Sequence, residues 1–310
     1  MASISFDPKT DIPSLFGRTI FITGGTAGLG AGSITELARH DPEHIIFSGR
    51  NEKAANSLID RMRTESPAVK LTFIRCDISS LASVKQAATT ITSLTSRLDI
   101  LMLNAGIMAT AAATSAEGYE NQFATNHLGH ALLVKLLLPT LLSTASQGFD
   151  VRVINMTSIA YRQAPAEGID FTTLKSSQDS LGGAVIPGHR WARYGQSKLA
   201  QLLYSQELAK HHPEFSSVSV HPGIIMTGLF DGLPMLTALP VLLMSLGQRT
   251  PVEQGHYNQC WAATCDKSKL KNGGYYEPVG VLTTPTTKQA NDANLADELW
   301  KWTQEQLEGY

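Results

Sequence analysis

The sequence predicts an α/β fold in which helices cover both faces of a mostly parallel sheet. Short apolar runs rich in β-branched residues alternate with longer runs at helical spacing. Because parallel strands are joined by right-handed helical crossovers, this order gives a doubly wound, three-layer α/β/α arrangement. The expected strands are Arg18–Thr23, His44–Ser48, Leu71–Arg75, Leu98–Leu103, Val151–Asn155 and Val218–His221, and the expected helices are Leu29–Arg39, Glu52–Glu65, Leu81–Ser96, Tyr119–Leu142 and Arg193–His211.

The composition suits one globular domain spanning residues 1–310. Hydrophobic residues make up 43% of the chain and charged residues 17%, a balance that supports a large buried core. No linker rich in proline, serine or glycine divides the chain, so we expect a single domain. Basic and acidic residues are intermixed and give a net charge of −2 without a basic cluster, so we expect no nucleic-acid partner.

The cysteines and the N-terminus favour a reducing compartment. Three cysteines are too few, and odd in number, for a disulfide framework. The spacing of Cys260 and Cys265 matches no usual zinc pair, so we expect no metal. Residues 1–13 lack the apolar core of a signal peptide, and the apolar stretch 229–246 is interrupted by Asp231, Gly232, Pro234 and Pro240, so it looks like two short broken helices. We therefore expect a cytoplasmic protein without an integral membrane span.

A glycine cluster follows the first expected strand and opens the first expected helix. Residues 23–30 read TGGTAGLG, with glycines at Gly24, Gly28 and Gly30. A dinucleotide pyrophosphate must approach backbone N–H groups at a helix N-terminus, and glycine leaves that approach open. A tight turn without a ligand is the alternative explanation, but the position between a strand and a helix near the start of the chain favours a nucleotide site.

The end of the second expected strand favours NADP(H) over NAD(H). A carboxylate at this point would accept hydrogen bonds from a ribose 2′-hydroxyl. The chain instead reads Ser48-Gly49-Arg50-Asn51. The Arg50 guanidinium is suited to a 2′-phosphate, although a solvated surface arginine is the alternative explanation.

Two further segments at strand ends are candidate cofactor contacts. Asp77 follows the third expected strand, where it is placed to contact the adenine. Asn104-Ala105-Gly106 ends the fourth, where small residues let the backbone pass close to a nucleotide. Either segment alone also fits ordinary turn chemistry.

Tyr194 and Lys198 form a candidate proton-transfer pair. They are four residues apart at the start of an expected helix and therefore share a face. An unperturbed tyrosine has a pKa of ~10, and a nearby ammonium favours the phenolate, so we expect the pKa of Tyr194 to be lowered. A tyrosine that merely packs on a lysine stem is the alternative explanation for this spacing.

Two polar residues in apolar surroundings support that pair. Ser158 follows the fifth expected strand at the carboxyl edge of the sheet, where its hydroxyl can hold a substrate oxygen. Asn126 lies inside an apolar helical run, where an unbonded amide is costly, and we expect it to fix a water that leads protons to Lys198. Nearby His127 and His130 are interpreted as structural.

As an ordered set, these motifs resemble the short-chain dehydrogenase/reductase family over about residues 17–230. Residues 126–130 and 49–51 look most like its retinol-dehydrogenase-like branch and like fungal members that serve secondary metabolism. The set comprises residues 23–30, Asn104-Ala105-Gly106, Asn126, Ser158, Tyr194, Lys198 and His221-Pro222-Gly223.

The resemblance implies a Rossmann-type sheet of seven parallel strands and an active site in which Asn126, Ser158, Tyr194 and Lys198 are catalytic. It also implies that Lys198 holds the nicotinamide ribose and that the residues after the Pro-Gly pair contact the carboxamide. Family members often form dimers or tetramers through the helices after the fourth and fifth strands, so a homodimer or homotetramer is expected. The expected NADP(H) contacts are Gly24, Thr26, Gly28, Leu29, Gly30, Arg50, Asp77, Asn104, Gly106, Tyr194, Lys198, Ile225 and Thr227.

Two segments depart from the β-α alternation, at about residues 161–190 and 227–250. The first makes the interval from Ser158 to Tyr194 longer than is usual in the family, and it is interpreted as a pocket wall or lid rather than a surface loop. The second contains the apolar run 229–246. That run is expected to close over an apolar substrate, with a subunit contact or a peripheral membrane contact as alternatives.

The sequence therefore predicts an NADPH-dependent reductase, or the reverse dehydrogenase, of a lipophilic carbonyl compound or alcohol. A tailoring step in secondary-metabolite biosynthesis fits the resemblance. Two other classes remain open: a catalytically silent NADP(H)-binding scaffold or redox sensor, and a dehydratase or isomerase on the same fold.

Overall fold

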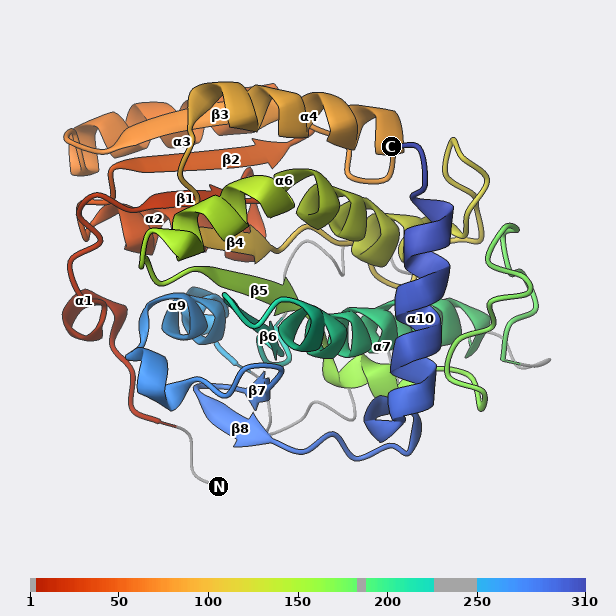
Figure 1. Ribbon diagram of the computed structural model, residues 1–310. Helices are drawn as coiled ribbons and strands as arrows, with labels where there is room; N and C mark the ends of the chain where they lie inside the picture. The colour runs from red at the N-terminus through yellow and green to blue at the C-terminus, as the bar shows by residue number, and fades with distance from the viewer. Residues whose placement is uncertain (1–3, 183–187, 226–249) are drawn as a thin grey trace.

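The computed structural model describes residues 4–182, 188–225 and 250–310 (Figure 1). These residues form an eight-stranded sheet in the order β3-β2-β1-β4-β5-β6-β7-β8. Neighbours from β3 to β7 pair in parallel, and β8 pairs with β7 in the antiparallel sense. The strands are β1 (Thr19–Ile22), β2 (His44–Gly49), β3 (Lys70–Arg75), β4 (Ile100–Leu103), β5 (Arg152–Met156), β6 (Ser216–Val220), β7 (Tyr275–Glu277) and β8 (Val281–Thr283). The doubly wound Rossmann-type prediction is confirmed; its seven parallel strands carry β8 as an additional edge strand.

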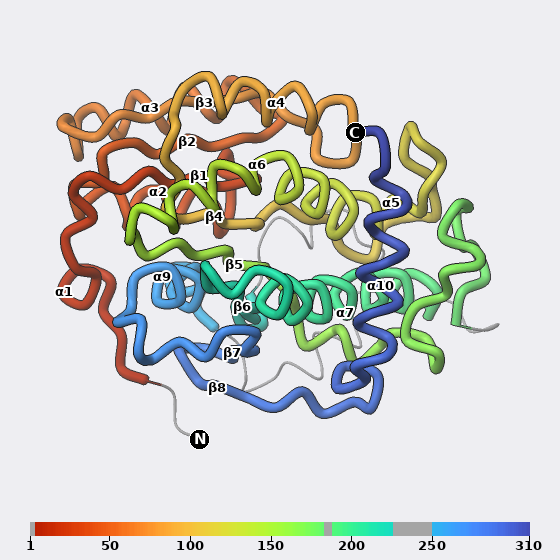
Figure 2. Tube along the Cα trace, in the orientation of Figure 1, coloured from red at the N-terminus to blue at the C-terminus, as the bar shows by residue number. Residues whose placement is uncertain are grey.

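Helices cover both faces of the sheet (Figures 1 and 2). One apolar cluster joins α4, α6, α7 and α10 to one face, and a second joins α2, α3 and α9 to the other. The α-helices are α1 (Pro8–Asp11), α2 (Gly28–Ala38), α3 (Glu52–Glu65), α4 (Leu81–Leu94), α5 (Asn121–Phe123), α6 (Gly129–Ser146), α7 (Gly188–His211), α9 (Tyr257–Thr264) and α10 (Ala293–Gln306). Between α5 and α6 lies the π-helix η1 (Ala124–Leu128), and the 3₁₀ turns are η2 (Ile159–Gln163), η4 (Val252–Gln254), η5 (Lys267–Lys269) and η6 (Gln289–Asn291).

The expected elements are present, with two informative differences. The helix expected over Tyr119–Leu142 contains a π-turn, and an inserted residue of this kind often marks a functional site. The helix that carries Tyr194 begins at Gly188 instead of Arg193. After residue 250 the fold is completed by α9, β7, β8 and α10, which are not among the expected elements.

The C-terminal helix α10 lies across α7 (Figure 1). Leu299 of α10 is fully buried in the core. Trp300 stacks on Tyr204 of α7 with ring centroids 5.5 Å apart. Thr303 Oγ1 lies 2.9 Å from the Nε2 atom of His127, so α10 also contacts the π-helix. Residues far apart in the sequence therefore fix the helix that carries Tyr194 and Lys198.

The helical run Asn121–Ser146 is long and apolar enough to cross a membrane on length and composition alone. Of its most apolar window, 56% is buried inside the protein, as in the central helix of a globular core. The apolar run 229–246 lies outside the described residues.

We expect Leu299→Ala to destabilise the protein by about 2–5 kcal/mol, because it leaves a cavity under α10. Urea unfolding followed by circular dichroism measures this loss. Glu298→Ala is the matched control, since Glu298 is exposed on the same helix, and its effect should stay within about 0.5 kcal/mol. Equal effects of the two variants would show that α10 does not anchor the core.

Candidate active site

A cavity of about 600 Å³ opens at the carboxyl ends of the central strands. This is where an open α/β sheet binds its ligands. Nearly all of the predicted site residues line it. Gly30 and Asn126 are not among its lining residues, and Thr227 lies outside the described residues. The predicted residues in the lining are Gly24, Thr26, Gly28, Leu29, Arg50, Asp77, Asn104, Gly106, Ser158, Tyr194, Lys198 and Ile225.

The glycine cluster, residues 23–30, forms one end of the cavity, and we call it the cradle. Gly24 has φ +68°, and a Cβ there would lie 2.9 Å from the Cα atom of Ala105. A Cβ on Gly30 would collide with the carbonyl oxygen of Gly24. Gly28, with φ +53°, faces open space, and Ala27 leaves the N-terminus of α2 without a side-chain cap. The free N–H groups and the positive end of the helix dipole fit a pyrophosphate.

Thr23 joins the cradle to the loop after β4. Its Oγ1 accepts the backbone N–H groups of Asn104 and Ala105, each at 2.9 Å. The Asn104 side chain donates to the carbonyl of Thr23 at 2.8 Å and to that of Gly24 at 3.3 Å. Asn104 therefore has a defined packing role beside the cavity in addition to its predicted cofactor contact.

The end of the cavity beside β2 and β3 carries one cation and one carboxylate. Arg50 is exposed at the cavity rim after β2. Among the described lining residues, Asp77 is the only carboxylate, and its Oδ1 atom accepts the N–H and the hydroxyl of Ser79. A 2′-phosphate would therefore meet a guanidinium at this rim without a competing acid at the end of β2.

Ser158 and Tyr194 meet at the other end of the cavity. Tyr194 is 7% exposed and shares a side-chain hydrogen bond with Ser158. Burial raises the pKa of Tyr194 to about 12, and the bond from Ser158 opposes this only in part. The expectation of a lowered Tyr194 pKa is therefore wrong for this structure. The reason is that desolvation outweighs the bond from Ser158, and the Nζ atom of Lys198 lies 5.6 Å from the centre of the tyrosine ring.

Lys198 is buried and has two oxygen partners. Its Nζ atom donates to the carbonyl of Met156 at 2.8 Å and to Oε1 of Gln201 at 2.7 Å. Burial lowers the pKa of Lys198 to about 7. Gln201 is not among the predicted site residues, although its position three residues after Lys198 places it on the same helical face.

Asn126 lies in the π-helix η1 and is fully buried. Its Nδ2 atom donates to the carbonyl of Ile107 at 3.0 Å and to the hydroxyl of Ser197 at 2.8 Å, while its Oδ1 atom accepts the Ile107 N–H. Both amide protons are therefore used to join the loop after β4 to α7. The expected water-mediated route to Lys198 stays a prediction.

His130 continues this network towards the cradle. Its Nδ1 atom lies 2.9 Å from the backbone carbonyl of Asn126, and its Nε2 atom lies 2.9 Å from Oγ1 of Thr23. A carbonyl only accepts, so the hydrogen-bond network assigns the ring proton to Nδ1 and makes Nε2 the acceptor of the Thr23 hydroxyl. Burial lowers the pKa of His130 to about 4, which keeps this ring neutral near pH 7.

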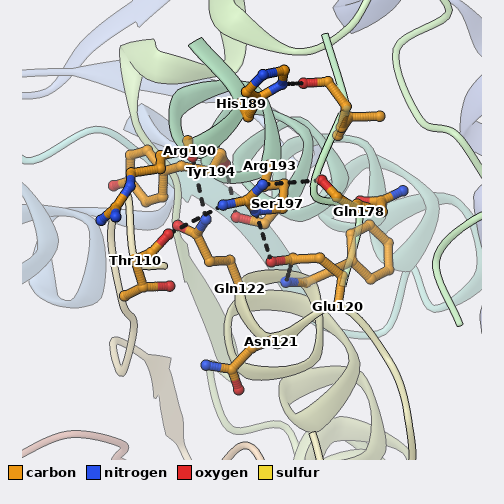
Figure 3. A network of polar contacts seen from close by, with 12 residues as sticks. Thr110, Glu120, Asn121, Gln122, Gln178, His189, Arg190, Arg193, Tyr194 and Ser197 are labelled. Atoms are coloured by element: carbon orange, nitrogen blue, oxygen red, sulfur yellow. Dashed lines mark hydrogen bonds and ion pairs between the residues drawn. The ribbon is translucent and has the colours of Figure 1, made fainter. Parts of the chain in front are cut away.

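A buried polar network precedes Tyr194 on α7 (Figure 3). Arg193 donates to the carbonyls of Gln178, at 3.0 Å, and Thr110, at 3.2 Å. Its Nε atom lies 3.5 Å from Oε1 of Glu120. Burial raises the pKa of the Glu120 carboxyl to about 7, because it outweighs the charge of Arg193. Arg193 thus ties the segment before α7 and the loop after β4 to the helix turn that carries Tyr194.

The described part of the expected 161–190 insertion contacts α7 and also the C-terminal part of the chain, where Gln289 donates to the carbonyl of Ala166 at 2.6 Å. Gln196 donates to Gln178 at 2.9 Å and accepts the N–H of Asp170 at 2.9 Å. Among the described residues of this insertion, Gln163 alone lines the cavity. Trp191, one residue after the end of the insertion, lines it as well. A lid role for residues 161–190 and 227–250 stays a prediction, since most of the second segment lies outside the described residues.

A family model for the short chain dehydrogenases matches residues 18–182, just over half of the chain. Several similar proteins also carry the family's name, and their similarity extends over nearly the whole chain. The chain belongs to the short-chain dehydrogenase/reductase family of oxidoreductases.

Three relatives illustrate the breadth of this similarity. An uncharacterized oxidoreductase of Schizosaccharomyces pombe is 37% identical, over 94% of this chain and 86% of that protein. A short-chain dehydrogenase/reductase of Aspergillus calidoustus is 32% identical, over 96% of this chain and 95% of that protein. The chloroplastic short-chain dehydrogenase TIC 32 A of Brassica napus is 37% identical, over 91% and 86%.

Solved structures share the fold. A crystal structure of an uncharacterized protein from Mycobacterium paratuberculosis matches with a TM-score of 0.71 and 29% identity, over 96% of each chain. An NADPH-bound carbonyl reductase from chicken fatty liver matches with a TM-score of 0.63 over 89% of this chain and 97% of that one. At 18% identity, the second likeness shows the fold alone.

Buried neutral histidines predict a loss of stability in mild acid. Burial lowers the pKa of His127 to about 3 and that of His130 to about 4, while the unfolded chain titrates near 6.5. A lowered folded-state pKa gives stability that is present above pH 6.5 and lost as the pH falls towards the folded value. Each ring should therefore contribute about 1.4 kcal/mol to the loss between pH 7.5 and 5.5.

Urea unfolding at the two pH values tests this expectation. His127→Phe and His130→Phe should each reduce the pH-dependent loss by that amount. Tyr204→Phe is the control, because Tyr204 packs on His127 with ring centroids 5.2 Å apart but does not titrate in this range. An unchanged pH dependence in both histidine variants would mean that these rings are protonated in the folded protein.

Proposed function

We propose that this oxidoreductase uses NADP(H) and interconverts a lipophilic carbonyl compound and its alcohol. The proposal rests chiefly on the juxtaposition of Ser158, Tyr194 and Lys198 at one end of a cavity whose other end is the glycine cradle. A scaffold that only binds a nucleotide has no need of a hydrogen-bonded serine and tyrosine beside a buried lysine.

The cradle fits a dinucleotide phosphate. Gly28 faces open space at the uncapped N-terminus of α2, and Gly24 has a backbone conformation that side chains rarely allow. Arg50 stands at the rim where a 2′-phosphate would lie. Lys198 and Ile225 line the opposite end, where the nicotinamide riboside would be held. When bound, the nicotinamide supplies or accepts the hydride.

Tyr194 is suited to give a proton to the substrate oxygen. Its raised pKa keeps the phenol protonated in the absence of a ligand, so the group is ready to act as the acid in the reducing direction. The Ser158 hydroxyl, already bonded to Tyr194, would hold the same oxygen as negative charge develops there. In the oxidising direction Tyr194 would first have to lose its own proton, and its phenolate would then accept the proton of the alcohol while Ser158 holds the same oxygen.

The wall around this pair is largely apolar. Met108, Ile159 and Ala160 line the cavity next to Tyr194. Trp191 adds an aromatic face, with its ring centroid 6.0 Å from that of Tyr194. These side chains favour a substrate with an apolar body and a single polar reacting group.

The same proposal includes a tailoring step in secondary-metabolite biosynthesis. This part of the proposal is supported by the similarity to family members from two fungi, Aspergillus calidoustus and Colletotrichum higginsianum. A homodimer or homotetramer, a cytoplasmic location and a peripheral membrane contact stay predictions. Helix α10 already covers part of α7, one of the helices through which assembly was expected.

We expect Tyr194→Phe to lower kcat for NADPH-dependent reduction about 10²- to 10⁴-fold, because the acid is removed while the ring remains. Stopped-flow or steady-state assays with a panel of ketones and aldehydes of increasing apolar size measure this. NADPH affinity, measured by fluorescence, should change little. Tyr204→Phe is the control, since Tyr204 is buried on the same helix but does not line the cavity.

Three outcomes would point elsewhere. NADPH binding without turnover of any carbonyl or alcohol would favour the scaffold or redox sensor. Product formation that does not consume NADPH would favour a dehydratase or isomerase. Turnover of Tyr194→Phe at the native rate would remove Tyr194 from the reaction.

We expect Arg50→Ala to weaken NADPH binding by about 10- to 100-fold while NADH binding changes little, because one charge-assisted contact is lost. Titration with both cofactors measures the ratio. Arg75→Ala is the matched control: Arg75 is exposed on β3, opposite Gly49 in the strand register, and does not line the cavity. An unchanged NADPH affinity in Arg50→Ala would contradict the assignment.

A further inference from the structure

The Lys198 ammonium depends on two oxygen atoms. Lys198 is 5% exposed, and its Nζ atom donates to the Met156 carbonyl at 2.8 Å and to the Gln201 side chain at 2.7 Å. In the described part of the chain, no carboxylate forms an ion pair with it. A buried ammonium without partners would shift towards its neutral form. The Met156 carbonyl and the Gln201 amide therefore determine what fraction of Lys198 stays protonated.

The titratable groups around Lys198 add no compensating negative charge. Tyr194 faces it from the same helix, with the phenol kept protonated by burial. His130 faces it from α6, and His221 faces it from the end of β6. Burial lowers the pKa of both histidines, and the charge of Lys198 lowers them further. Both rings are therefore neutral near pH 7 and offer no charge to balance the ammonium.

Gln201 points its amide oxygen at Lys198 and leaves its own amide nitrogen unpaired among the described residues. It is 2% exposed, and its Nε2 atom is buried without a hydrogen-bond partner among the described residues. Leaving an amide donor unpaired is unfavourable, so the contact of Oε1 with the ammonium must compensate for it. The other oxygen, from Met156, belongs to the backbone of β5. Gln201 is therefore the side chain through which this charge can be tuned.

The contact also places the ammonium at the cavity. A Cβ built on Gly106, which lines the cavity, would lie 3.7 Å from Nζ of Lys198. Gln201 lies three residues beyond Lys198 on the same face of α7, and the bonded Nζ atom lies 5.6 Å from the centre of the Tyr194 ring.

We propose that Gln201 is a positioning residue for the proposed reaction: its amide oxygen holds the Lys198 ammonium beside Gly106 and favours the charged form of that lysine. The inference rests on the proposed function for its catalytic meaning. Its physical content, the effect of Gln201 on the titration of Lys198, holds for the protein without ligands.

Lysine NMR tests this directly. Protein labelled with ¹³C at lysine Cε is titrated from pH 5 to 11, and the Lys198 signal is identified by its loss in Lys198→Met. We expect the pKa of Lys198 to fall by about one to two units in Gln201→Met, because a hydrogen bond to the charged form is lost. In Gln201→Glu the pKa should rise, since the acceptor then carries a charge.

Gln196→Met is the matched control. Gln196 is buried on the same helix, but it bonds to Gln178 and Asp170 rather than to Lys198. It should leave the Lys198 titration unchanged. If Gln201→Met does not fold, Gln201→Asn replaces it, because the shorter amide cannot reach the ammonium and should also lower the pKa.

A Lys198 pKa that is the same in native protein, Gln201→Met and Gln201→Glu would overturn the proposal, as would an equal shift in Gln196→Met. In activity assays, the loss of kcat/KM at high pH should move to lower pH in Gln201→Met and to higher pH in Gln201→Glu. Failure of the proposed function would give a different result. The Lys198 pKa would still fall in Gln201→Met and rise in Gln201→Glu, but no carbonyl compound would be reduced.

Discussion

The buried side chain of Asn126 holds together the segments that form the candidate active site. Its amide donates to the carbonyl of Ile107 and the hydroxyl of Ser197, and its oxygen accepts the Ile107 N–H. Ile107 belongs to the loop after β4, and Ser197 lies between Tyr194 and Lys198 on α7. Leaving any of these groups unpaired at this depth would cost about 1–3 kcal/mol, so the loop and the helix have little freedom to separate.

His130 extends this constraint to the cofactor cradle. The ring binds the carbonyl of Asn126 on one side and the hydroxyl of Thr23 on the other. That hydroxyl in turn accepts the N–H groups of Asn104 and Ala105, so its single donor and both of its lone pairs are used. The glycine cluster and the Tyr194–Lys198 pair are therefore joined by one buried network, which explains why two polar residues are tolerated within an apolar helix.

Burial acts on the two titratable groups of the site in opposite directions. It raises the pKa of Tyr194 and lowers that of Lys198, because in each case it disfavours the charged form. Ser158 moderates the first shift through its hydrogen bond. The oxygens of Met156 and Gln201 solvate the ammonium that burial disfavours. The site thus keeps a protonated phenol next to a lysine whose charge is sensitive to its surroundings.

The sequence by itself determined the α/β order, the glycine cradle and the Tyr194–Lys198 pair, because these depend on periodicity, backbone freedom and the pitch of a helix. It also placed Gln201 one turn after Lys198, but no local pattern says where that amide oxygen points. Only the tertiary structure decided the π-turn at Asn126, the packing of α10 and the direction of the Tyr194 pKa. Each of these depends on burial and on contacts between residues far apart in the chain, which a linear pattern does not contain.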